Sequence, residues 1–376
     1  MTGAQAAADA KRVAAIVTEY RYNSHAEMIL GRLLGAFDYK PEVRVVSIYT
    51  DQVPEGDMSR EAAARLSIPI CGTIREAVLA RHCPEPIDGV IIIGEHGSYP
   101  INEKGQMLYP RRRMLEETLA ALDEMGLVVP IFLDKHFSYD TDDAFWMYGE
   151  LKRRGIPFMG GSSIPHTDPV PPYDPRRLHS LREILVISHS TLLEGYGFHA
   201  LDVLQSVAER RRGGESGVRS VQVVQGPDVW EAMDRGEWPE DLMLQALAAY
   251  PGLGPEHPRT LDPHPTLMVI DYVDGTKGYV VQFRSLVEQW GFAVRCEDGG
   301  IIAARCNSGL DRPFDHFERL TRMIERMIVT RKPPFPMERT LMSTGLVNAV
   351  VDAAYLGRKL ETPELSAISY HPADEA

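Results

Sequence analysis

Short apolar runs alternate with segments of helical periodicity through about the first 160 residues, and this alternation constrains the fold more than any other feature. The runs lie at 13–17, 43–49, 89–93, 131–133 and 157–159. Between them, Ser24, Thr73 and Asp140 stand where helix N-caps are expected. Apolar strands separated by amphipathic helices are typical of a parallel sheet covered by helices on both faces. The sequence therefore predicts a Rossmann-like, doubly wound α/β domain over residues 11–163.

The pattern changes after Gly160, where a proline-rich stretch follows. Strand-like runs then succeed one another at 218–224, 266–271, 278–283 and 292–296, with helices expected at 313–329 and 343–357. Consecutive strands without helices between them favour antiparallel pairing. We therefore expect a second, α+β domain over residues 164–376, built on an open, mainly antiparallel sheet.

Composition excludes several classes of function. The chain has 40 basic and 53 acidic residues and a net charge of −13, which disfavours nucleic acid and anionic membranes as partners. The four cysteines form no C-x-x-C pair, so neither a zinc site nor a disulfide framework is expected. There is no apolar signal region near the start and no run of membrane-spanning length. These features predict a cytoplasmic protein.

Ionisable side chains follow three neighbouring strands of the predicted parallel sheet. They are Glu19, Arg21 and His25 after the first strand, Glu95 and His96 after the strand at 89–93, and Lys135 and His136 after the strand at 131–133. Ligands of open α/β sheets bind at the carboxyl ends of the strands, so we expect one common site. Two alternatives remain open: helix caps and loop ion pairs, or a divalent metal held by Glu19, His25, Glu95, His96 and His136, although no metal-binding spacing is present.

Four segments resemble the Gfo/Idh/MocA oxidoreductase family, which includes glucose-fructose oxidoreductase and inositol dehydrogenase. They read EAAARLSIPICGTIREAV, DGVIIIGEHGSYP, IFLDKHFSYDTDDAFWMYGELKRRGIPFMGG and GYGFHALDVLQSVAERRRGG. The resemblance implies hydride transfer between NAD or NADP and a sugar- or polyol-like substrate. It implies that Lys135, matching the lysine of the family's Glu-Lys-Pro, orients or polarises a substrate hydroxyl. It also implies that His199 is the acid/base and Asp202 is structural. His136, in place of the family's proline, is a third catalytic candidate, and Asp134 replaces the family's glutamate.

The same resemblance implies a set of cofactor-binding residues. They are Thr18, Glu19, Tyr20, Asp51, Gly94, Glu95 and His96, with Asp51 placed to hold the adenosine ribose. The turn Thr18–Ser24 departs from the family because it contains no glycine, and Glu19 would repel a diphosphate. Gly195 replaces the family's acid four residues before His199. These departures leave a lyase, an isomerase, a metal-assisted hydrolase or a non-catalytic regulatory relative as alternatives.

Alternating apolar residues in the later strands predict self-association. They are Val221, Val223, Val269, Tyr279, Val281 and Phe283. An open sheet face of this kind would form a large apolar patch, which monomers rarely leave exposed. We therefore expect a homodimer or homotetramer joined through that face. The alternative is a face covered by the chain's own segment at 250–265.

Overall fold

The computed structural model describes residues 10–309 and 311–372, which cluster into two compact units. The first unit contains the described part of Met1–Gly161 together with Asp311–Met337. The second contains the described parts of Ser162–Leu310 and Glu338–Ala376. The segment around 313–329, which we expected in the second domain, folds with the first unit.

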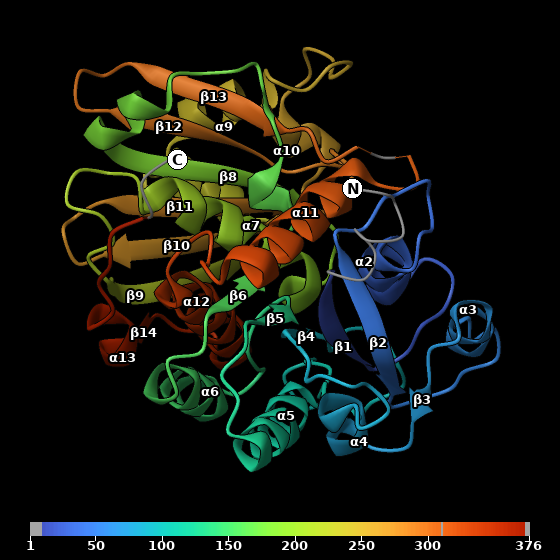
Figure 1. Cartoon of the computed structure of the whole chain (residues 1–376). Coiled ribbons are helices and arrows are strands. Elements are labelled where there is room, and N and C mark those ends of the chain that lie inside the picture. The colour runs from blue at the N-terminus through green and yellow to red at the C-terminus, as the bar shows by residue number, and fades with distance from the viewer. Residues whose placement is uncertain (1–9, 310, 373–376) are drawn as a thin grey trace. The chain divides into compact units, whose positions relative to one another are not determined.

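The first unit is built on a six-stranded sheet in the order β3-β2-β1-β4-β5-β6, in which every pair is parallel. The strands are β1 Lys11–Val17, β2 Val43–Thr50, β3 Ile70–Cys71, β4 Gly89–Ile93, β5 Ile131–Asp134 and β6 Phe158–Gly161 (Figure 1). β4 and β5 are buried at every residue, because helices cover the sheet. This is the strand order of a Rossmann fold and confirms the predicted doubly wound domain.

Local capping chemistry sets the helices of this unit. They are α2 His25–Leu33, α3 Ser59–Leu66, α4 Ile74–Leu79, α5 Arg111–Met125, α6 Thr141–Arg153 and α11 Asp315–Thr330. The side chains of Ser24, Thr73 and Asp140 accept hydrogen bonds from the backbone N–H three residues later, as predicted. α3 begins at Ser59 after the N-cap residue Met58, which makes no side-chain capping hydrogen bond.

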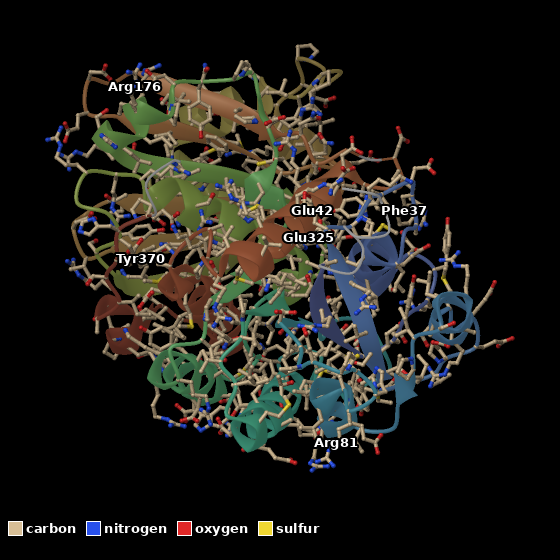
Figure 2. All side chains as sticks on the ribbon, in the orientation of Figure 1. Phe37, Glu42, Arg81, Arg176, Glu325 and Tyr370 are labelled. Atoms are coloured by element: carbon tan, nitrogen blue, oxygen red, sulfur yellow. The ribbon has the colours of Figure 1, made fainter. Side chains whose placement is uncertain are left out.

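The carboxylate of Glu325 anchors α11 to the first unit. This buried side chain accepts hydrogen bonds from the backbone N–H of Glu42 and of Val43 and from the hydroxyl of Tyr39 (Figure 2). The apolar side of α11, including Leu320 and other residues, joins the core formed by β1, β2 and α2. A segment nearly 300 residues from β1 in sequence is therefore part of the same core.

The second unit contains an eight-stranded sheet in the order β14-β9-β10-β11-β8-β12-β13-β7. Its strands are β7 Pro169–Val170, β8 Leu181–His189, β9 Val218–Gln225, β10 Thr266–Tyr272, β11 Lys277–Phe283, β12 Gly291–Cys296, β13 Ile301–Cys306 and β14 Leu360–Glu361. Only the β11–β8 pair is parallel, which confirms the mainly antiparallel sheet. Sequence analysis did not identify β8 or β13.

The prediction of one open sheet face is wrong. The chain itself covers that face at Tyr279, Val281 and Phe283, with Val269 packed against the same cluster, and the strand register places Val221 and Val223 on the opposite face. The helices of this unit are α7 Leu193–Ala208, α8 Asp228–Asp234, α9 Glu240–Leu247, α10 Pro258–Leu261, α12 Met337–Leu356 and α13 Pro363–Ser366, with short 3₁₀ turns at Ile164–His166 and Pro175–Ser180. Tyr279, Val281 and Phe283 are buried in one apolar cluster with Trp230 of α8 and Leu242 of α9. Helices that we had not predicted therefore provide the cover, rather than a second subunit or the 250–265 segment alone.

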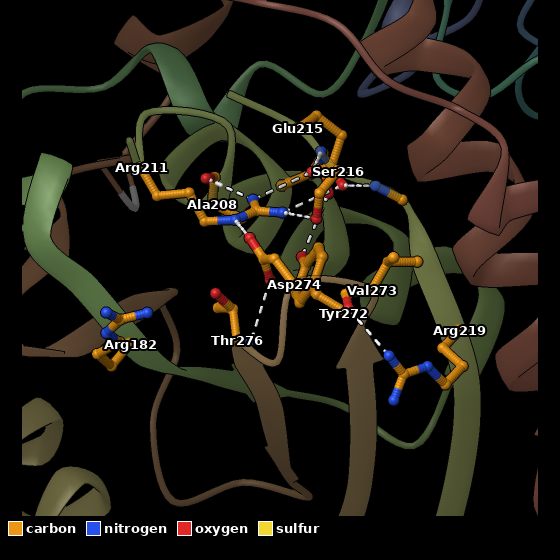
Figure 3. Close-up of polar contacts among 12 residues, drawn as sticks. Arg182, Ala208, Arg211, Glu215, Ser216, Arg219, Tyr272, Val273, Asp274 and Thr276 are labelled. Atoms are coloured by element: carbon orange, nitrogen blue, oxygen red, sulfur yellow. Dashed lines mark hydrogen bonds and ion pairs between the residues drawn. The ribbon is translucent and has the colours of Figure 1, made fainter. Parts of the chain in front are cut away.

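A buried polar network fixes the loop that follows α7. Arg211 donates to the carbonyl of Ala208, to Asp274 and to Ser216, and its guanidinium lies 4.6 Å from the ring centre of Tyr272 (Figure 3). Each guanidinium nitrogen of Arg211 thus has a partner, which avoids the cost of burying it alone.

Among the described residues, no helix is long and apolar enough to cross a membrane.

Candidate active site

The carboxylate of Glu95 is the centre of a charged cluster at the carboxyl edge of the first sheet. It accepts a hydrogen bond of 2.6 Å from Arg111, and its other oxygen lies 3.6 Å from the ammonium nitrogen of Lys135. Burial disfavours the ionised form of Glu95, but the charges of Lys135 and Arg111 outweigh burial and hold its pKa far below the ordinary value. Glu95 is therefore a fixed anion that keeps two cations in place.

Lys135 has an unusual backbone conformation directly after β5. Its φ is +68°, and its backbone N–H donates to the carbonyl of Gly161 over 3.2 Å. A positive φ in a lysine is uncommon, and such residues cluster at functional sites. The next residue, His136, is buried, and its Nε2 lies 3.3 Å from a guanidinium nitrogen of Arg111. Two predicted catalytic residues and Glu95 thus share one cluster.

His25, His96 and Asp134 complete this cluster. Nδ1 of His25 lies 2.7 Å from a carboxylate oxygen of Asp134, and the His25 and His96 rings are 5.1 Å apart. Burial, reinforced by the charge of His25, lowers the pKa of His96 to about 4, so this ring is neutral near pH 7. In the sheet order, β4 lies between β1 and β5, which explains why residues following these three strands meet.

Three of the predicted cofactor-binding residues have packing or hydrogen-bonding roles within the protein. The hydroxyl of Thr18 donates to the backbone carbonyl of Glu95 over 2.6 Å. Tyr20 is a core residue, and burial raises its pKa to about 12. A side chain at Gly94 would come within 2.7 Å of Arg111, so this glycine permits the close approach of that arginine.

Asp51, the predicted ribose-binding acid, already has partners for both carboxylate oxygens. One accepts from the hydroxyl of Tyr49 at 2.7 Å and from Arg113 at 2.5 Å, and the other accepts from the hydroxyl of Tyr99 at 2.7 Å. Burial opposes ionisation, but the hydrogen bonds from Tyr99, Tyr49 and Arg113 outweigh it and lower the pKa of Asp51. A ribose would have to share or replace these donors.

The turn between β1 and α2 decides whether a dinucleotide diphosphate fits in the family's pose. Glu19 is buried there and pairs with Arg21 over 2.5 Å. Ser24 accepts from the backbone N–H of Glu27, and the carboxylate of Glu27 accepts from the backbone N–H of Asn23, the residue before the cap. Its carboxylate also pairs with Arg312 at 2.9 and 3.1 Å.

The chain's own carboxylates therefore occupy the position at which a helix N-terminus normally receives phosphate. The turn does not fit a diphosphate in the pose that a glycine fingerprint creates. A bound dinucleotide would have to displace Arg312 from Glu27 or lie outside that pose.

His199, the predicted acid/base, lies in the second unit on α7. Its Nδ1 is 2.6 Å from the hydroxyl of Ser162. Asp202 is buried and accepts from the backbone N–H of Ser162 at 2.8 Å and the hydroxyl of Ser343 at 2.6 Å, which suits the structural role expected of it. Ser162 was not among the predicted site residues, since a serine after two glycines belongs to no recognisable motif.

Aromatic rings surround His199 within the second unit. Trp290 lies 5.0 Å from the His199 ring and stacks on Tyr196 at 5.9 Å, and His189 lies 4.6 Å from Trp290. These residues come from α7, from the end of β8 and from the segment before β12, so no local pattern linked them. Aromatic faces beside a hydrogen-bonding imidazole suit a ligand that has both C–H and O–H groups.

The residues considered as metal ligands do not form a metal-binding group. Within residues 10–309 and 311–372, no set of three or more His, Cys, Asp or Glu side chains is arranged to hold an ion. The ion pairs of Glu19, Glu95 and Asp134 engage these carboxylates with protein cations and imidazole instead.

Comparisons with known proteins agree with the fold. No family model and no curated protein matches the chain. Among solved structures, GenD2 of gentamicin A biosynthesis, in complex with NAD, is 14% identical with a TM-score of 0.57, covering 94% of this chain and 96% of that one. A myo-inositol dehydrogenase from Corynebacterium glutamicum is 14% identical with a TM-score of 0.56, covering 94% and 98%. A protein from Desulfitobacterium hafniense assigned as an NADPH-dependent oxidoreductase is 14% identical with a TM-score of 0.57, covering 94% and 98%.

These similarities confirm the predicted resemblance at the level of the fold. The chain has the fold of the Gfo/Idh/MocA-type inositol dehydrogenases and NAD-binding oxidoreductases over most of its length. One of these solved structures contains NAD, and another is of a protein assigned as NADPH-dependent.

Proposed function

We propose that this chain, which has the fold of the Gfo/Idh/MocA-type dehydrogenases, is an NAD(P)-dependent oxidoreductase acting on a small sugar- or polyol-like substrate. The observation that carries the proposal is Lys135, whose ammonium is held beside Glu95 at the carboxyl end of β5. The nicotinamide of NAD(P), when bound, supplies the hydride acceptor or donor. The inositol dehydrogenases among the similar structures support a polyhydroxylated substrate.

The chain's own residues supply the polar chemistry. The ammonium of Lys135, 3.6 Å from a carboxylate oxygen of Glu95, can donate a hydrogen bond to a substrate hydroxyl and stabilise the charge that grows on the hydroxyl oxygen. Arg111 holds the other oxygen of Glu95 and so fixes its orientation. Within the second unit, the imidazole of His199 can form hydrogen bonds, and its neighbours Trp290 and Tyr196 offer apolar faces.

Binding of the reduced cofactor tests the proposal. We expect NADH or NADPH to bind with a dissociation constant below about 1 mM, which corresponds to a binding free energy stronger than about −4 kcal/mol. We also expect Glu27→Gln to bind about three- to tenfold more tightly, because it removes a negative charge from the N-terminus of α2. Fluorescence titration measures both. Glu55→Gln, an exposed carboxylate of the same unit, is the control and should leave affinity unchanged. Absence of binding by either nucleotide contradicts the proposal.

Loss of the Lys135 ammonium should abolish most of the activity. For Lys135→Met we expect kcat to fall by roughly 10²–10³, the usual effect of removing one donor to a developing oxyanion. The fold should persist, because Arg111 still compensates Glu95. Steady-state kinetics with NAD(P)⁺ and myo-inositol, alongside circular dichroism, provide the measurement. Lys152→Met, on the exposed end of α6, is the matched control. Equal kcat in both variants would contradict the assignment of Lys135 to the active site.

A second candidate function is suggested by the filled turn between β1 and α2. If neither nucleotide binds, the same cluster can serve a lyase or isomerase that moves protons without a redox cofactor. Glu27 and Arg312 favour this alternative, because they occupy the usual diphosphate position. The titration distinguishes the two functions.

Two further properties stay proposals. We infer a cytoplasmic protein, because all four cysteines are free thiols, as expected in a reducing compartment. The homodimer or homotetramer remains a prediction, and it must use a surface other than the covered face of Tyr279, Val281 and Phe283.

A further inference from the structure

His25 and Asp134 form a carboxylate–imidazole pair within the first unit. His25 is the first residue of α2, Asp134 is the last residue of β5, and their side chains meet at 2.7 Å although 109 residues separate them in sequence. We propose that this pair is the proton-transfer base of the active site, with Nε2 of His25 as the atom that accepts the proton. The inference rests on the proposed function in one respect: the proton transfer prepares the hydride transfer of that function.

The hydrogen bond defines which nitrogen of His25 is free to act. An ionised carboxylate only accepts hydrogen bonds, so the proton of a neutral His25 ring belongs on Nδ1, facing Asp134. Nε2 then carries the lone pair. Among the residues that the structure describes, Nε2 of His25 has no hydrogen-bond partner. The His25 side chain is 17% exposed and that of Asp134 only 2%, so the imidazole is reachable while its carboxylate partner is shielded.

The surroundings of His25 combine one carboxylate with two rings. Asp134 lies on one side of the ring, and the neutral His96 and the ring of Phe317 lie at 5.1 and 5.0 Å. Glu95 lies close enough to His25 that the charge of His25 lowers the pKa of Glu95. Asp134 can compensate the charge that His25 gains when it accepts a proton, and the ammonium of Lys135 lies beside Glu95 in the same cluster.

The environment of His199 argues for a different role. The hydroxyl oxygen of Ser162 accepts a hydrogen bond from the backbone N–H of Ile164 at 3.0 Å. The same hydroxyl lies 2.6 Å from Nδ1 of His199, so its proton can be donated to Nδ1. In that arrangement a neutral His199 carries its proton on Nε2, which makes it a hydrogen-bond donor. A donor role for His199 also agrees with Gly195, which replaces the acid that the family has four residues before this histidine. The carboxylate that orients a base is found beside His25 instead.

The step is a proton transfer without change of oxidation state. The O–H bond of a substrate hydroxyl breaks, an N–H bond forms at Nε2 of His25, and the electron pair stays on the substrate oxygen beside Lys135. Asp134 stabilises the imidazolium and does not itself take the proton. The ring returns to neutral by releasing the proton to water.

Nuclear magnetic resonance tests the tautomer without any cofactor or substrate. In the ¹⁵N-histidine-labelled full chain at pH 7.5, we expect the His25 signals, assigned by their loss in His25→Gln, to show the proton on Nδ1. Asp134→Asn should shift the proton to Nε2, because the amide can donate to Nδ1. A wild-type His25 protonated on Nε2 overturns the proposal.

Reactivity tests the base itself. Diethyl pyrocarbonate attacks unprotonated imidazole nitrogen, and peptide mapping by mass spectrometry gives the rate at each histidine. We expect His25 to react at least about fivefold faster in the wild type than in Asp134→Asn, because Nε2 loses its lone pair in the variant. Equal rates overturn the proposal. His82, whose Nε2 contacts the carbonyl of Val46, is an internal reference that Asp134→Asn should not change.

Activity provides the last arm. For His25→Gln we expect kcat with NAD(P)⁺ and myo-inositol to fall by about 10²–10⁴, the range for loss of a general base, while His82→Gln leaves it unchanged. A His25→Gln variant that folds and keeps full kcat overturns the role of the base, although the proposed oxidoreductase stands. If the wild type binds neither nucleotide, the proposed function fails, and the tautomer and the reactivity still decide the state of His25.

Discussion

Arg339→Met is expected to lower the free energy of unfolding by about 3–5 kcal/mol, the cost of breaking a buried ion pair from one side. Arg339 on α12 pairs with Glu209 at 2.8 Å, and both side chains are almost fully buried. Burial raises the pKa of Glu209 and of Asp202, and the charge of Arg339 opposes that rise in both. Without the guanidinium, two carboxylates face each other in a site from which water is excluded.

Denaturation followed by tryptophan fluorescence measures this loss, because Trp230, Trp238 and Trp290 all lie in the second unit. Arg182→Met is the matched control. Arg182 pairs with Glu297 on the surface, where such pairs contribute about 0–1 kcal/mol. A double variant, Arg339→Met with Glu209→Gln, should recover part of the stability, since one buried charge is removed. A loss below about 1 kcal/mol for Arg339→Met would show that the network does not depend on this cation.

Acid is expected to destabilise the first unit between pH 6.5 and about 4. The pKa of His96 is lowered to about 4 by burial and by the charges of His25, Lys135 and Arg21. The pKa of His316 is lowered to about 3 by burial and by the charges of His25 and Arg32. Below the unfolded value of 6.5, the unfolded chain binds more protons than the folded one, so stability falls as the pH falls. Each ring contributes at most about 1.4 kcal/mol per pH unit.

Urea unfolding at pH 7.5, 6.5, 5.5 and 4.5, followed by circular dichroism, provides the measurement. Replacing His96 and His316 by glutamine should flatten the slope over this window, whereas His82→Gln should not. Below about 4.5 a second loss is expected, because Glu95 has a lowered folded pKa and then takes up its proton on unfolding. An unchanged slope in the double variant would contradict the assignment to these two rings.

The sequence alone determined those parts of the fold whose cause is local. Ser24, Thr73 and Asp140 cap their helices because the acceptor and the donor lie within one turn. Continuous apolar runs predicted β4 and β5, because a parallel strand under two layers of helix is buried on both faces. The rule that ligands meet the carboxyl ends of parallel strands predicted that Glu95 and Lys135 would lie together.

Tertiary structure decided which partners the charged and apolar groups take. Glu27 pairs with Arg312, 285 residues away, and His25 pairs with Asp134, 109 residues away. Helical and strand periodicity describe which face of an element is apolar, but they do not specify which element covers it. For that reason the sequence did not predict that α11 belongs to the first unit or that α8 and α9 cover the second sheet. It also did not predict that Glu19 pairs with Arg21 in the turn between β1 and α2. Local physics selects the elements, whereas the energy of burying charge and apolar surface selects their neighbours.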